Sequence, residues 1–592
     1  MVDWRKRTVQ SGDVTLAVFE LGDEGAPPVM LVHGWPDTHH LWDQVAPALA
    51  KEFHVIAHDN RGAGESSRPG GVAGYHIAEL ADDLLTVADE VSPERPVHIV
   101  GHDWGSVLTW EAVSRHGAEK RIASFVSVSG PSLDQLGAWA RENLSRPTPR
   151  RVATSLSQIA SSAYTAFFHL PVAPRILLSF LGIPAVWRNF LKVTEGTPAD
   201  RVSIAPTLRR DMISGVALYR ANIVPHLSHP EPHPTTVPVL ELVNHRDVAL
   251  RPAIFEHTHR YVQRLWRRDT PTGHWLPHTH PEYLTEAARA FIGYQETGSL
   301  EKPAWSERTR LIGPPQAFSG RLAVVTGAGS GIGRETAYAL AELGCEIVAA
   351  DIDAVAAEET ARECRAKTVP ATAYALDVAD SAGFAEFANT VQRDHGVPDI
   401  VVNNAGVGLA GGVLDATDEQ IDRLLDINLR GVITGSRLFG RQMVERDLGG
   451  QIVNLASAAA FTPQRDLGVY SASKAGVLLF SESLRAELAD HHIGVTAICP
   501  GIVDTAIVAN TPIAGLGSDE QAARDRLVRF YQRRGFTPDK VARQIVAAIR
   551  SDKAVVPVTP EASVGYRIYR FAPWLSRQAA RRRVAAPVPT RR

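Results

Sequence analysis

The sequence has few cysteines and no long apolar run. Its 592 residues include three cysteines, Cys345, Cys364 and Cys499, and no two of them have the spacing of a zinc site or a disulfide framework. This usage is typical of a reducing compartment. No stretch approaches the roughly 20 apolar residues that cross a bilayer, and the start, MVDWRKRTVQ, lacks the apolar core of a secretory signal. We therefore expect a soluble, cytoplasmic protein.

A large excess of charge of one sign is also missing. The formal net charge is −3, which argues against nucleic acid as a partner. The exception is the C-terminal stretch, which has eight arginines and no acid between Ser563 and Arg592, interleaved with YRIYRFAPWL. We expect residues 561–592 to form a basic tail that is solvated and partly disordered. The alternative is a peripheral contact with the anionic inner face of the plasma membrane.

The chain is too long for one hydrophobic core, because domains usually contain roughly 100–200 residues. Apolar, β-branched runs such as PVMLVH, FHVIAH, VHIVGH and VPVLELVN alternate with helical patterns, which indicates α/β domains with parallel sheets. A helical insertion at about residues 131–233 predicts a cap on the first domain, residues 1–297. Residues 298–318, rich in charge, proline and glycine, predict a linker to a second domain at 319–560.

The stretch VGHDWGS at residues 100–106 has the spacing of a nucleophile elbow, but Asp103 replaces the usual serine. After it, LVNHRD ends a predicted strand with Asp247, and TGHW supplies His274. The order nucleophile, acid, histidine is that of the α/β-hydrolase fold. The motif HGWPD, residues 33–37, follows another strand where an oxyanion-hole N–H is expected.

These motifs resemble those of the α/β-hydrolase superfamily, specifically the epoxide hydrolases and the related haloalkane dehalogenases, over about residues 5–295. The resemblance implies that Asp103 attacks an sp3 carbon and forms an alkyl ester. His274 then activates the water that cleaves this ester. By position, the oxyanion hole would consist of the backbone N–H groups of Trp35 and Trp104.

The cap sequence separates the two families. An epoxide oxygen needs a proton donor as the ring opens, whereas a halide leaves as a stable anion. The stretches YTAFFHLP and ALYRAN resemble the two cap motifs of epoxide hydrolases and place Tyr164 and Tyr219 as these donors. The segment HGWP also lacks the asparagine that dehalogenases often carry. An epoxide hydrolase is favoured, and a dehalogenase-like first half is the alternative.

The second half opens with a glycine-rich turn. VVTGAGSGIGRE places Gly327, Gly331 and Gly333 between a predicted strand and a helix, where glycines allow the backbone to approach a pyrophosphate. The next strand ends in Asp351, which can bind ribose hydroxyls and would repel a 2′-phosphate. No arginine follows it directly. The sequence therefore favours NAD over NADP.

Further motifs follow in the order LDV, NNAG, DINLRG, IVNLAS, YSASK and CPGIVDT. They resemble the short-chain dehydrogenase/reductase family over about residues 320–560 and imply a doubly wound, Rossmann-type sheet. The resemblance implies that Tyr470 is the acid/base, that Lys474 lowers the pKa of Tyr470 and binds the nicotinamide ribose, that Ser457 orients the substrate, and that Asn428 holds a relay water. The implied cofactor site consists of Gly327, Ser330, Gly331, Ile332, Gly333, Asp351, Asp377, Asn404, Tyr470 and Lys474.

Together the halves predict a bifunctional enzyme that hydrolyses an epoxide and oxidises or reduces an alcohol or carbonyl with NAD, on small-molecule or lipid substrates. We also expect a homo-oligomer formed through the dehydrogenase domain. The alternative from another class is that one half acts only as a binding or scaffold module.

Overall fold

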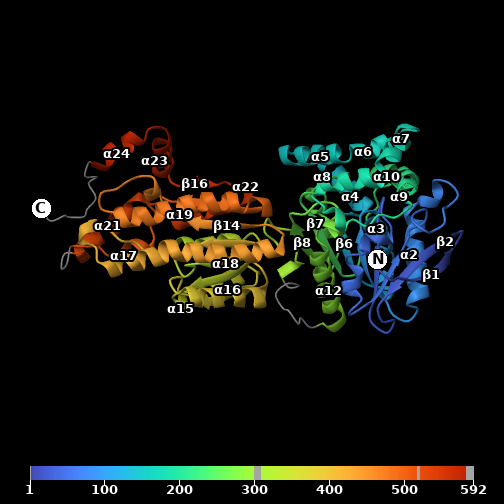
Figure 1. The fold of residues 1–592 in the computed structure, drawn as a ribbon, viewed down its shortest axis with the longest axis horizontal. Helices are drawn as coiled ribbons and strands as arrows, with labels where there is room; N and C mark the ends of the chain where they lie inside the picture. The colour runs from blue at the N-terminus through green and yellow to red at the C-terminus, as the bar shows by residue number, and fades with distance from the viewer. Residues whose placement is uncertain (1, 299–307, 516–519, 582–592) are drawn as a thin grey trace. The chain divides into compact units, whose positions relative to one another are not determined.

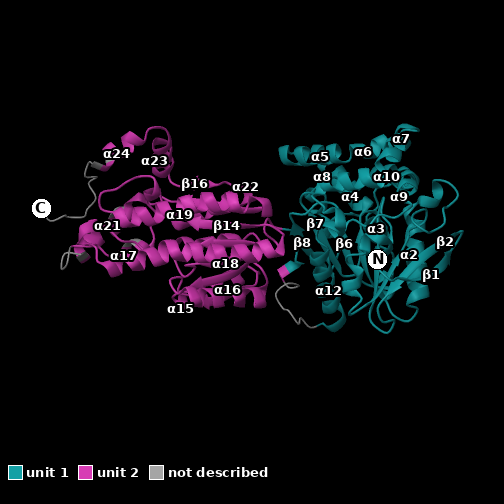
Figure 2. Ribbon diagram, viewed as in Figure 1, with its two compact units in different colours: residues 1–301, 309–315 teal, residues 302–308, 316–592 magenta. Residues whose placement is uncertain are grey.

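The computed structural model describes residues 2–298, 308–515 and 520–581. It divides into two compact units (Figure 2). The first contains Met1–Glu301 and Thr309–Pro315, and the second contains Lys302–Arg308 and Gln316–Arg592. Each unit is built on its own β-sheet, so each is described separately.

The first unit has a mixed sheet of nine strands within the described residues, in the order β1-β2-β4-β3-β5-β6-β7-β8-β9. The strands from β4 to β8 in this order are parallel, while β1–β2, β2–β4 and β8–β9 are antiparallel. The central strands are buried along their whole length, as their continuous apolar runs require. The strands are β1 Arg5–Ser11, β2 Val14–Leu21, β3 Pro28–Val32, β4 His54–His58, β5 Val97–His102, β6 Ile122–Val128, β7 Val239–Asn244, β8 Leu265–Thr270 and β9 Arg310–Leu311.

Helices cover this sheet (Figure 1). The longer ones are amphipathic; α2, for example, buries Leu80, Leu84 and Val87 at helical spacing. The helices outside the cap are α1 Ala46–Leu49, α2 Ile77–Val91, α3 Trp104–Val113, α11 Leu276–Thr279 and α12 Pro281–Thr297.

The insertion between β6 and β7 is helical throughout its regular structure. Figure 1 shows α5, α6 and α7 as the outermost row of this cap, with α4, α8, α9 and α10 beneath them. The cap helices are α4 Leu133–Ser145, α5 Pro149–Ser161, α6 Ala163–Phe168, α7 Ala173–Leu181, α8 Pro184–Glu195, α9 Leu208–Ser214 and α10 Val216–Ser228.

The predicted linker contains regular structure that the sequence did not indicate. β9 lies within residues 298–318 and pairs with β8 at the edge of the first sheet. This strand has only two residues, too few to show an alternating pattern. Residues 299–307 of the predicted linker lie outside the described residues.

The second unit has a fully parallel sheet of seven strands within its described part, in the order β12-β11-β10-β13-β14-β15-β16. The strand order reverses between β10 and β13, and ligands bind at the carboxyl ends of strands flanking such a switch point. The strands are β10 Leu322–Thr326, β11 Glu346–Asp351, β12 Ala371–Ala375, β13 Ile400–Asn403, β14 Gly450–Leu455, β15 Ile493–Cys499 and β16 Val555–Pro557.

Two hydrophobic layers cover the faces of this sheet. One contains apolar residues of α14, α15 and α22, and the other contains residues of α16, α18 and α19. The three cysteines are unpaired and buried. The helices are α14 Gly331–Ala341, α15 Ala354–Arg365, α16 Ser381–His395, α17 Asp418–Leu425, α18 Gly431–Arg446, α19 Gly468–Glu487, α20 Ala506–Ala509, α21 Glu520–Arg534 and α22 Pro538–Ser551.

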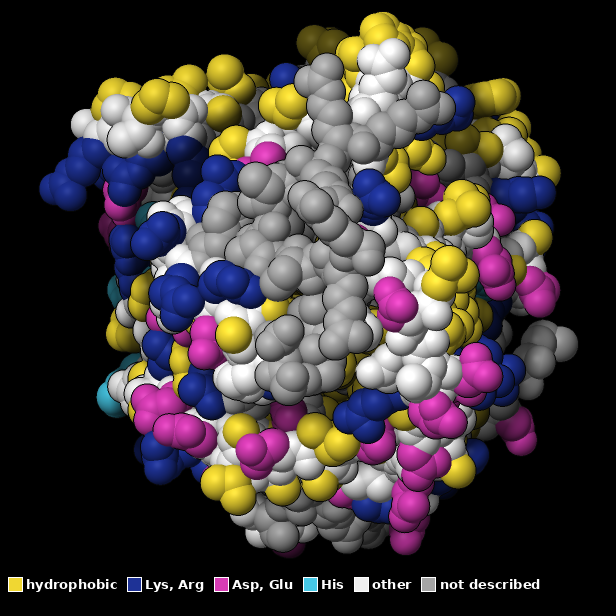
Figure 3. Space-filling model, turned by 90° about the vertical axis from the view of Figure 1, so that its left-hand side faces the viewer, with side chains coloured by type: hydrophobic (Ala, Val, Ile, Leu, Met, Phe, Trp, Pro, Cys, Tyr) yellow, Lys and Arg dark blue, Asp and Glu magenta, His cyan; other side chains and the backbone are white. Residues whose placement is uncertain are grey.

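The basic C-terminal stretch is more ordered than predicted. It forms α23 Pro560–Phe571 and α24 Pro573–Arg581, and the rest of it, residues 582–592, lies outside the described residues. Ala562 and Gly565 are buried, which anchors α23 to the second unit. Figure 3 faces this side of the unit and shows hydrophobic and basic side chains together along the upper edge.

Among the described residues, no single helix is long and apolar enough to cross a membrane. The cap helices α7 and α8 pass the same test as a pair, but the chain bends by 87° between them.

Candidate active sites of the two units

The turn between β5 and α3 holds Asp103 in an unusual backbone conformation. Its φ is +51° and its ψ is −125°, a region that non-glycine residues rarely occupy. The neighbouring glycines make the turn feasible, because a Cβ on Gly105 would lie 2.1 Å from the backbone oxygen of Val32. The carboxylate is therefore presented at the carboxyl end of the sheet, as the elbow motif predicts.

The predicted acid and histidine lie beside this carboxylate. His274 Nε2 is 3.6 Å from Asp103 Oδ1, and His274 Nδ1 is 2.9 Å from Asp247 Oδ2. Asp247 also accepts hydrogen bonds from the backbone N–H groups of Ala249 and Leu250, at 2.8 and 2.9 Å. Burial disfavours the charged ring, but the two carboxylates outweigh it and raise the pKa of His274 well above its usual value.

The backbone of His274 is also fixed. Its carbonyl oxygen accepts hydrogen bonds from His102 Nε2 at 2.8 Å and from Ser129 Oγ at 3.1 Å. Burial lowers the pKa of His102 to about 4, so that ring is neutral and its single N–H faces the carbonyl. These contacts leave the imidazole of His274 little freedom to turn away from Asp103.

The predicted oxyanion hole adjoins Asp103. The backbone N–H of Trp35 donates to Asp103 Oδ2 at 2.8 Å. A Cβ on Gly34 would lie 2.4 Å from this oxygen and 2.6 Å from the backbone nitrogen of Trp104. Gly34 therefore allows both predicted amides to lie close to the carboxylate. The indole N–H of Trp35 is used elsewhere, because it donates to the backbone oxygen of Met212 at 3.1 Å.

The two cap tyrosines lie together above this site. Tyr164 comes from α6 and Tyr219 from α10, and their ring centroids are 5.8 Å apart. Tyr219 also packs edge-on against Trp104, with centroids 5.0 Å apart. Burial, with a further contribution from the charge of Asp103, raises the pKa of both phenols. Both hydroxyls therefore remain protonated at neutral pH.

Two acids near His274 were not assigned a role from the sequence. Asp37 accepts a hydrogen bond from the indole N–H of Trp275 at 3.0 Å, and burial raises its pKa to about 7. Glu195, at the end of cap helix α8, lies against the backbone of residues 273–275, and burial raises its pKa. Asp37 could have been found in HGWPD, whereas no motif marks Glu195.

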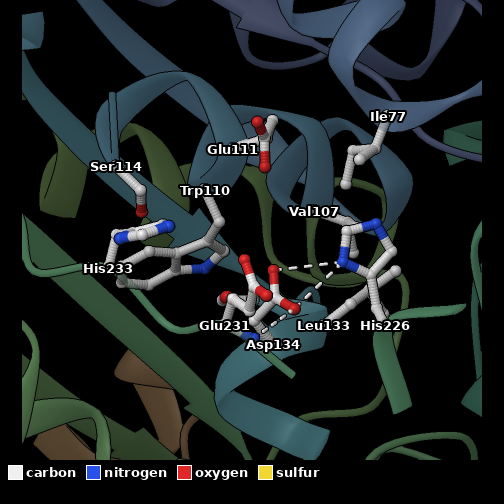
Figure 4. A pocket seen from close by; sticks show the side chains of 11 residues that line it. Ile77, Val107, Trp110, Glu111, Ser114, Leu133, Asp134, His226, Glu231 and His233 are labelled. Carbon is white, nitrogen blue, oxygen red and sulfur yellow. Dashed lines mark hydrogen bonds and ion pairs between the residues drawn. The ribbon is translucent and has the colours of Figure 1, made fainter. Parts of the chain in front are cut away.

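The pocket in Figure 4 is separate from these groups. It is lined by Trp110 of α3, Asp134 of α4 and His226 of α10, among others, and none of the predicted catalytic residues lines it. His226 Nδ1 lies 3.1 Å from both carboxylate oxygens of Asp134, an ion pair that ties α10 to α4. A second pocket lies beside the HGWPD loop, residues 33–37, and is lined by Trp35 and Asp37 among others.

In the second unit the glycine-rich loop, residues 327–333, has the backbone conformation and close contacts expected of a nucleotide-binding site. Gly327 and Gly331 have φ of +65° and +55°, and a Cβ on Gly333 would lie 2.1 Å from the backbone oxygen of Gly327. Ser330 precedes α14, and Gly331 to Gly333, with Ile332 between, form its first turn. The free N–H groups of this turn can receive a pyrophosphate.

The other predicted cofactor residues lie around this loop. Asp351 ends β11 and accepts a hydrogen bond from the backbone N–H of Gly329 at 2.7 Å. The side chain of Asn404 donates to the backbone oxygens of Thr326 and Gly327, each at 3.0 Å. Asp377 follows β12 and accepts from the backbone N–H of Ala379 at 3.0 Å. These residues fit a nicotinamide dinucleotide, NAD or NADP.

Ser457 and Tyr470 meet as predicted, and their hydroxyls interact. The expected effect of Lys474 on Tyr470 is not seen. Burial raises the pKa of Tyr470 to about 12, partly opposed by Ser457, and burial lowers the pKa of Lys474 to about 8. Lys474 Nζ donates to the backbone oxygen of Leu455 at 2.7 Å.

Asn428 lies in a π-helical turn, Asp426–Arg430. Its side chain accepts from the backbone N–H of Val407 and donates to the backbone oxygen of the same residue, each at 2.8 Å. The side chain therefore ties this turn to the loop after β13. That Asn428 holds a relay water stays a prediction, because the amide oxygen, with two lone pairs, can accept a second hydrogen bond.

Comparisons with known proteins agree with this division. The alpha/beta hydrolase fold family matches residues 27–154, and the short chain dehydrogenase family matches residues 321–513. A crystal structure of a short chain dehydrogenase/reductase from Burkholderia phymatum in complex with NAD is 27% identical, covering 46% of this chain and 99% of that one, with a TM-score of 0.41. The dehydrogenase fold implies binding of NAD or NADP.

Two curated relatives indicate how far the similarity extends. The diacetyl reductase, (S)-acetoin forming, of Staphylococcus epidermidis is 35% identical over 185 residues, 31% of this chain and 72% of the relative. The "Probable oxidoreductase EphD" of Mycobacterium tuberculosis is 44% identical over 589 residues, which is 98% of each chain. The chain therefore belongs to the same family as EphD, and joins an alpha/beta hydrolase domain to a short chain dehydrogenase/reductase domain in one polypeptide.

Proposed function

We propose that the first unit hydrolyses an epoxide to a vicinal diol through an ester on Asp103. One arrangement carries the proposal: a carboxylate at the elbow, with His274 3.6 Å away on one side and two protonated phenols above it. A carboxylate suits an sp3 carbon, because the resulting ester can be cleaved by water. The phenols suit a leaving oxygen that must be protonated.

In the first step, an oxygen of Asp103 bonds to an epoxide carbon as the C–O bond of the ring breaks. Tyr164 or Tyr219 gives a proton to the departing oxygen. Ester formation removes the charge of Asp103, one of the charges that raise the pKa of His274. His274 then returns its proton to the tyrosinate and becomes a base at the step that needs one.

In the second step, His274 takes a proton from water, and the hydroxide attacks the carbonyl carbon of the Asp103 ester. The N–H groups of Trp35 and Trp104 stabilise the oxyanion. Collapse of this intermediate breaks the ester C–O bond, and the departing oxygen takes the proton of the newly formed carboxylic acid, which releases the diol and restores the Asp103 carboxylate.

The test is to trap the ester. His274→Gln should open a styrene oxide-type substrate once and stop, and mass spectrometry should show one substrate mass added to the peptide that contains Asp103. Asp103→Asn is the matched control and should gain no mass. An unmodified His274→Gln protein that binds substrate would contradict the proposal, and halide release from a haloalkane at a comparable rate would favour the dehalogenase alternative.

We propose that the second unit is an NAD-dependent alcohol dehydrogenase or ketone reductase. Bound between the glycine loop and Lys474, NAD would accept or donate the hydride. The hydroxyl of Tyr470 would exchange a proton with the substrate oxygen, which Ser457 would hold through its own hydroxyl. Asp351 supports the preference for NAD, because its carboxylate lies at Gly329, where a 2′-phosphate would meet negative charge.

NAD reduction with a panel of vicinal diols and secondary alcohols tests this assignment. Tyr470→Phe should abolish turnover, while Tyr531→Phe, which removes a neighbouring, half-buried phenol, should retain it. Equal loss in both variants would contradict the role of Tyr470. No turnover by the unmodified protein with any alcohol or ketone would favour a binding module.

A further inference from the structure

The outer row of the cap exposes apolar side chains on two of its helices, α5 and α7. On α5 they are Val152, Leu156 and Ile159, and on α7 they are Ile176, Leu177 and Phe180, each between 44% and 69% exposed. The spacing within α5 places its three on one side of the helix. We call these six residues the outer cap face. Large exposed apolar patches mark interaction sites in soluble proteins.

The orientation of α5 supports this interpretation. Its buried side chain is the polar Gln158, which donates to the backbone oxygen of Ala249 at 3.0 Å and accepts from the backbone N–H of Arg251 at 2.8 Å. The polar side of α5 thus contacts the rest of the first unit, and its apolar side is exposed to solvent. In α7, Pro174 and Leu178 pack inward, so its exposed residues are additional to those needed for packing.

The charges within the segment that carries this face are of one sign. Residues 146–194 contain five arginines, one lysine and no acid. Arg150 and Arg151 pair with Glu256 and Glu142, which lie outside that segment. The remaining four, Arg146, Arg175, Arg188 and Lys192, make no ion pair with any residue in the described part of the chain.

We propose that the outer cap face binds the surface of an anionic lipid bilayer. The apolar side chains would enter the boundary between headgroups and acyl chains, and the unpaired cations would contact the phosphates. A second copy of this chain would bring the same cations to its own face and be repelled. A bilayer satisfies both the apolar and the cationic groups without a matching shape.

The binding would place a lipid next to the first site. The short helix α6 lies between α5 and α7 in the outer row and carries Phe168, whose ring packs against Trp35 and Tyr219 with centroids 5.3 and 4.9 Å apart. The outer row therefore contacts the groups beside Asp103 through Phe168. The proposal concerns surface binding and does not depend on the reaction assigned to Asp103.

The test is sedimentation of the full-length protein with vesicles of phosphatidylcholine alone or mixed with phosphatidylglycerol. We expect binding to the mixed vesicles that weakens with added salt. Ile159→Ser combined with Ile176→Ser, and separately Arg175→Gln combined with Arg188→Gln, should each weaken it at least about tenfold, since each removes at least about 1.4 kcal/mol of interaction. These positions are exposed, so circular dichroism should be unchanged.

The matched control is Phe571→Ser combined with Trp574→Ser on α23 and α24, whose side chains are 85% and 57% exposed. This variant should bind the mixed vesicles as the unmodified protein does. Loss of binding in it alone would overturn the proposal in favour of the basic C-terminal helices. Unchanged binding in both cap variants would also overturn it, as would light scattering that shows a dimer lost in those variants.

Discussion

Tyr164 and Tyr219 present two phenols to one position, and their pKa values are raised by burial first and by the charge of Asp103 in addition. Either hydroxyl can give a proton to a departing oxygen. We expect Tyr164→Phe and Tyr219→Phe each to lower kcat for epoxide opening by about tenfold to a hundredfold, and the double variant to lose nearly all activity. Rates of diol formation, measured for all four proteins, provide the check.

Tyr75→Phe is a suitable control, because it removes a buried phenol of the same unit that makes none of these contacts. It should open epoxides at nearly the normal rate. Normal activity in the double cap variant would show that the proton comes from another group.

Lys474 is buried, and its pKa falls from 10.5 to about 8. Below about pH 8 the ammonium is charged in both folded and unfolded states, so the folded state bears the full cost of burying it, about 3 kcal/mol. Removing the hydrogen bond to Leu455 offsets about 1 kcal/mol of this. Lys474→Met should therefore raise the unfolding free energy at neutral pH by about 2 kcal/mol while abolishing NAD turnover.

The gain should fade as the pH rises from about 8 to 10.5, because the lysine is then increasingly neutral in the folded protein. Urea unfolding of the unmodified protein and of Lys474→Met at several pH values measures this difference in unfolding free energy. A variant that is less stable at pH 7 would show that the ammonium is compensated in the folded protein.

At the scale of single residues, the sequence was sufficient to predict those that belong to local motifs. Asp103, Trp35 and His274 could be found because each lies in a turn whose spacing is fixed by the backbone. Glu195 could not, because the contact of α8 with His274 depends on how the cap folds back over the sheet. The pKa of Tyr470 was missed for a related reason: it depends on burial and on where Lys474 donates.

The turn from β5 to α3 is the element on which the first site depends. Gly105→Ala would place a Cβ 2.1 Å from the backbone oxygen of Val32, and a backbone atom cannot move aside cheaply. We expect a loss of at least about 3 kcal/mol in unfolding free energy, together with loss of epoxide opening. Urea midpoints measure the first effect.

Gly293→Ala, in α12, is the matched control. No atom lies within 4 Å of the added Cβ, so the better helix propensity of alanine should raise stability by about 0.5–1 kcal/mol. If the two substitutions had equal effects, the close approach at the elbow would not be what requires glycine.

Most parallel strands were predictable as elements because they are short and largely apolar, as in β3 and β10, whereas β8 has the sequence LWRRDT. The second sheet could be predicted because strand-like and helical segments alternate along its sequence. The first could be predicted from the same alternation, which the cap interrupts. β9 and the helices α23 and α24 were not predicted. A two-residue strand has no period, and the basic residues of α23 concealed the small residues that it buries against the second unit.

At the scale of the whole chain, the proposed product of one unit belongs to the substrate class of the other. Epoxide hydrolysis gives a vicinal diol, and a dehydrogenase can oxidise a secondary alcohol. The intact protein, given an epoxide and NAD, should therefore form a hydroxyketone. Asp103→Asn should block this from the epoxide but not from the diol, as chromatography of the products would show. If none of the diols formed from the epoxides that the first unit hydrolyses supports reduction of NAD, the two activities are unrelated.

The most direct test of the carboxylate mechanism is a single turnover of the unmodified protein, in excess over its epoxide, in water labelled with heavy oxygen. The account predicts an unlabelled diol and labelled carboxylate in the Asp103 peptide, because water attacks the ester carbonyl and the oxygen gained by the substrate comes from Asp103. Label in the diol and none in Asp103 after that first turnover would mean that water attacks the epoxide directly, and would contradict the account.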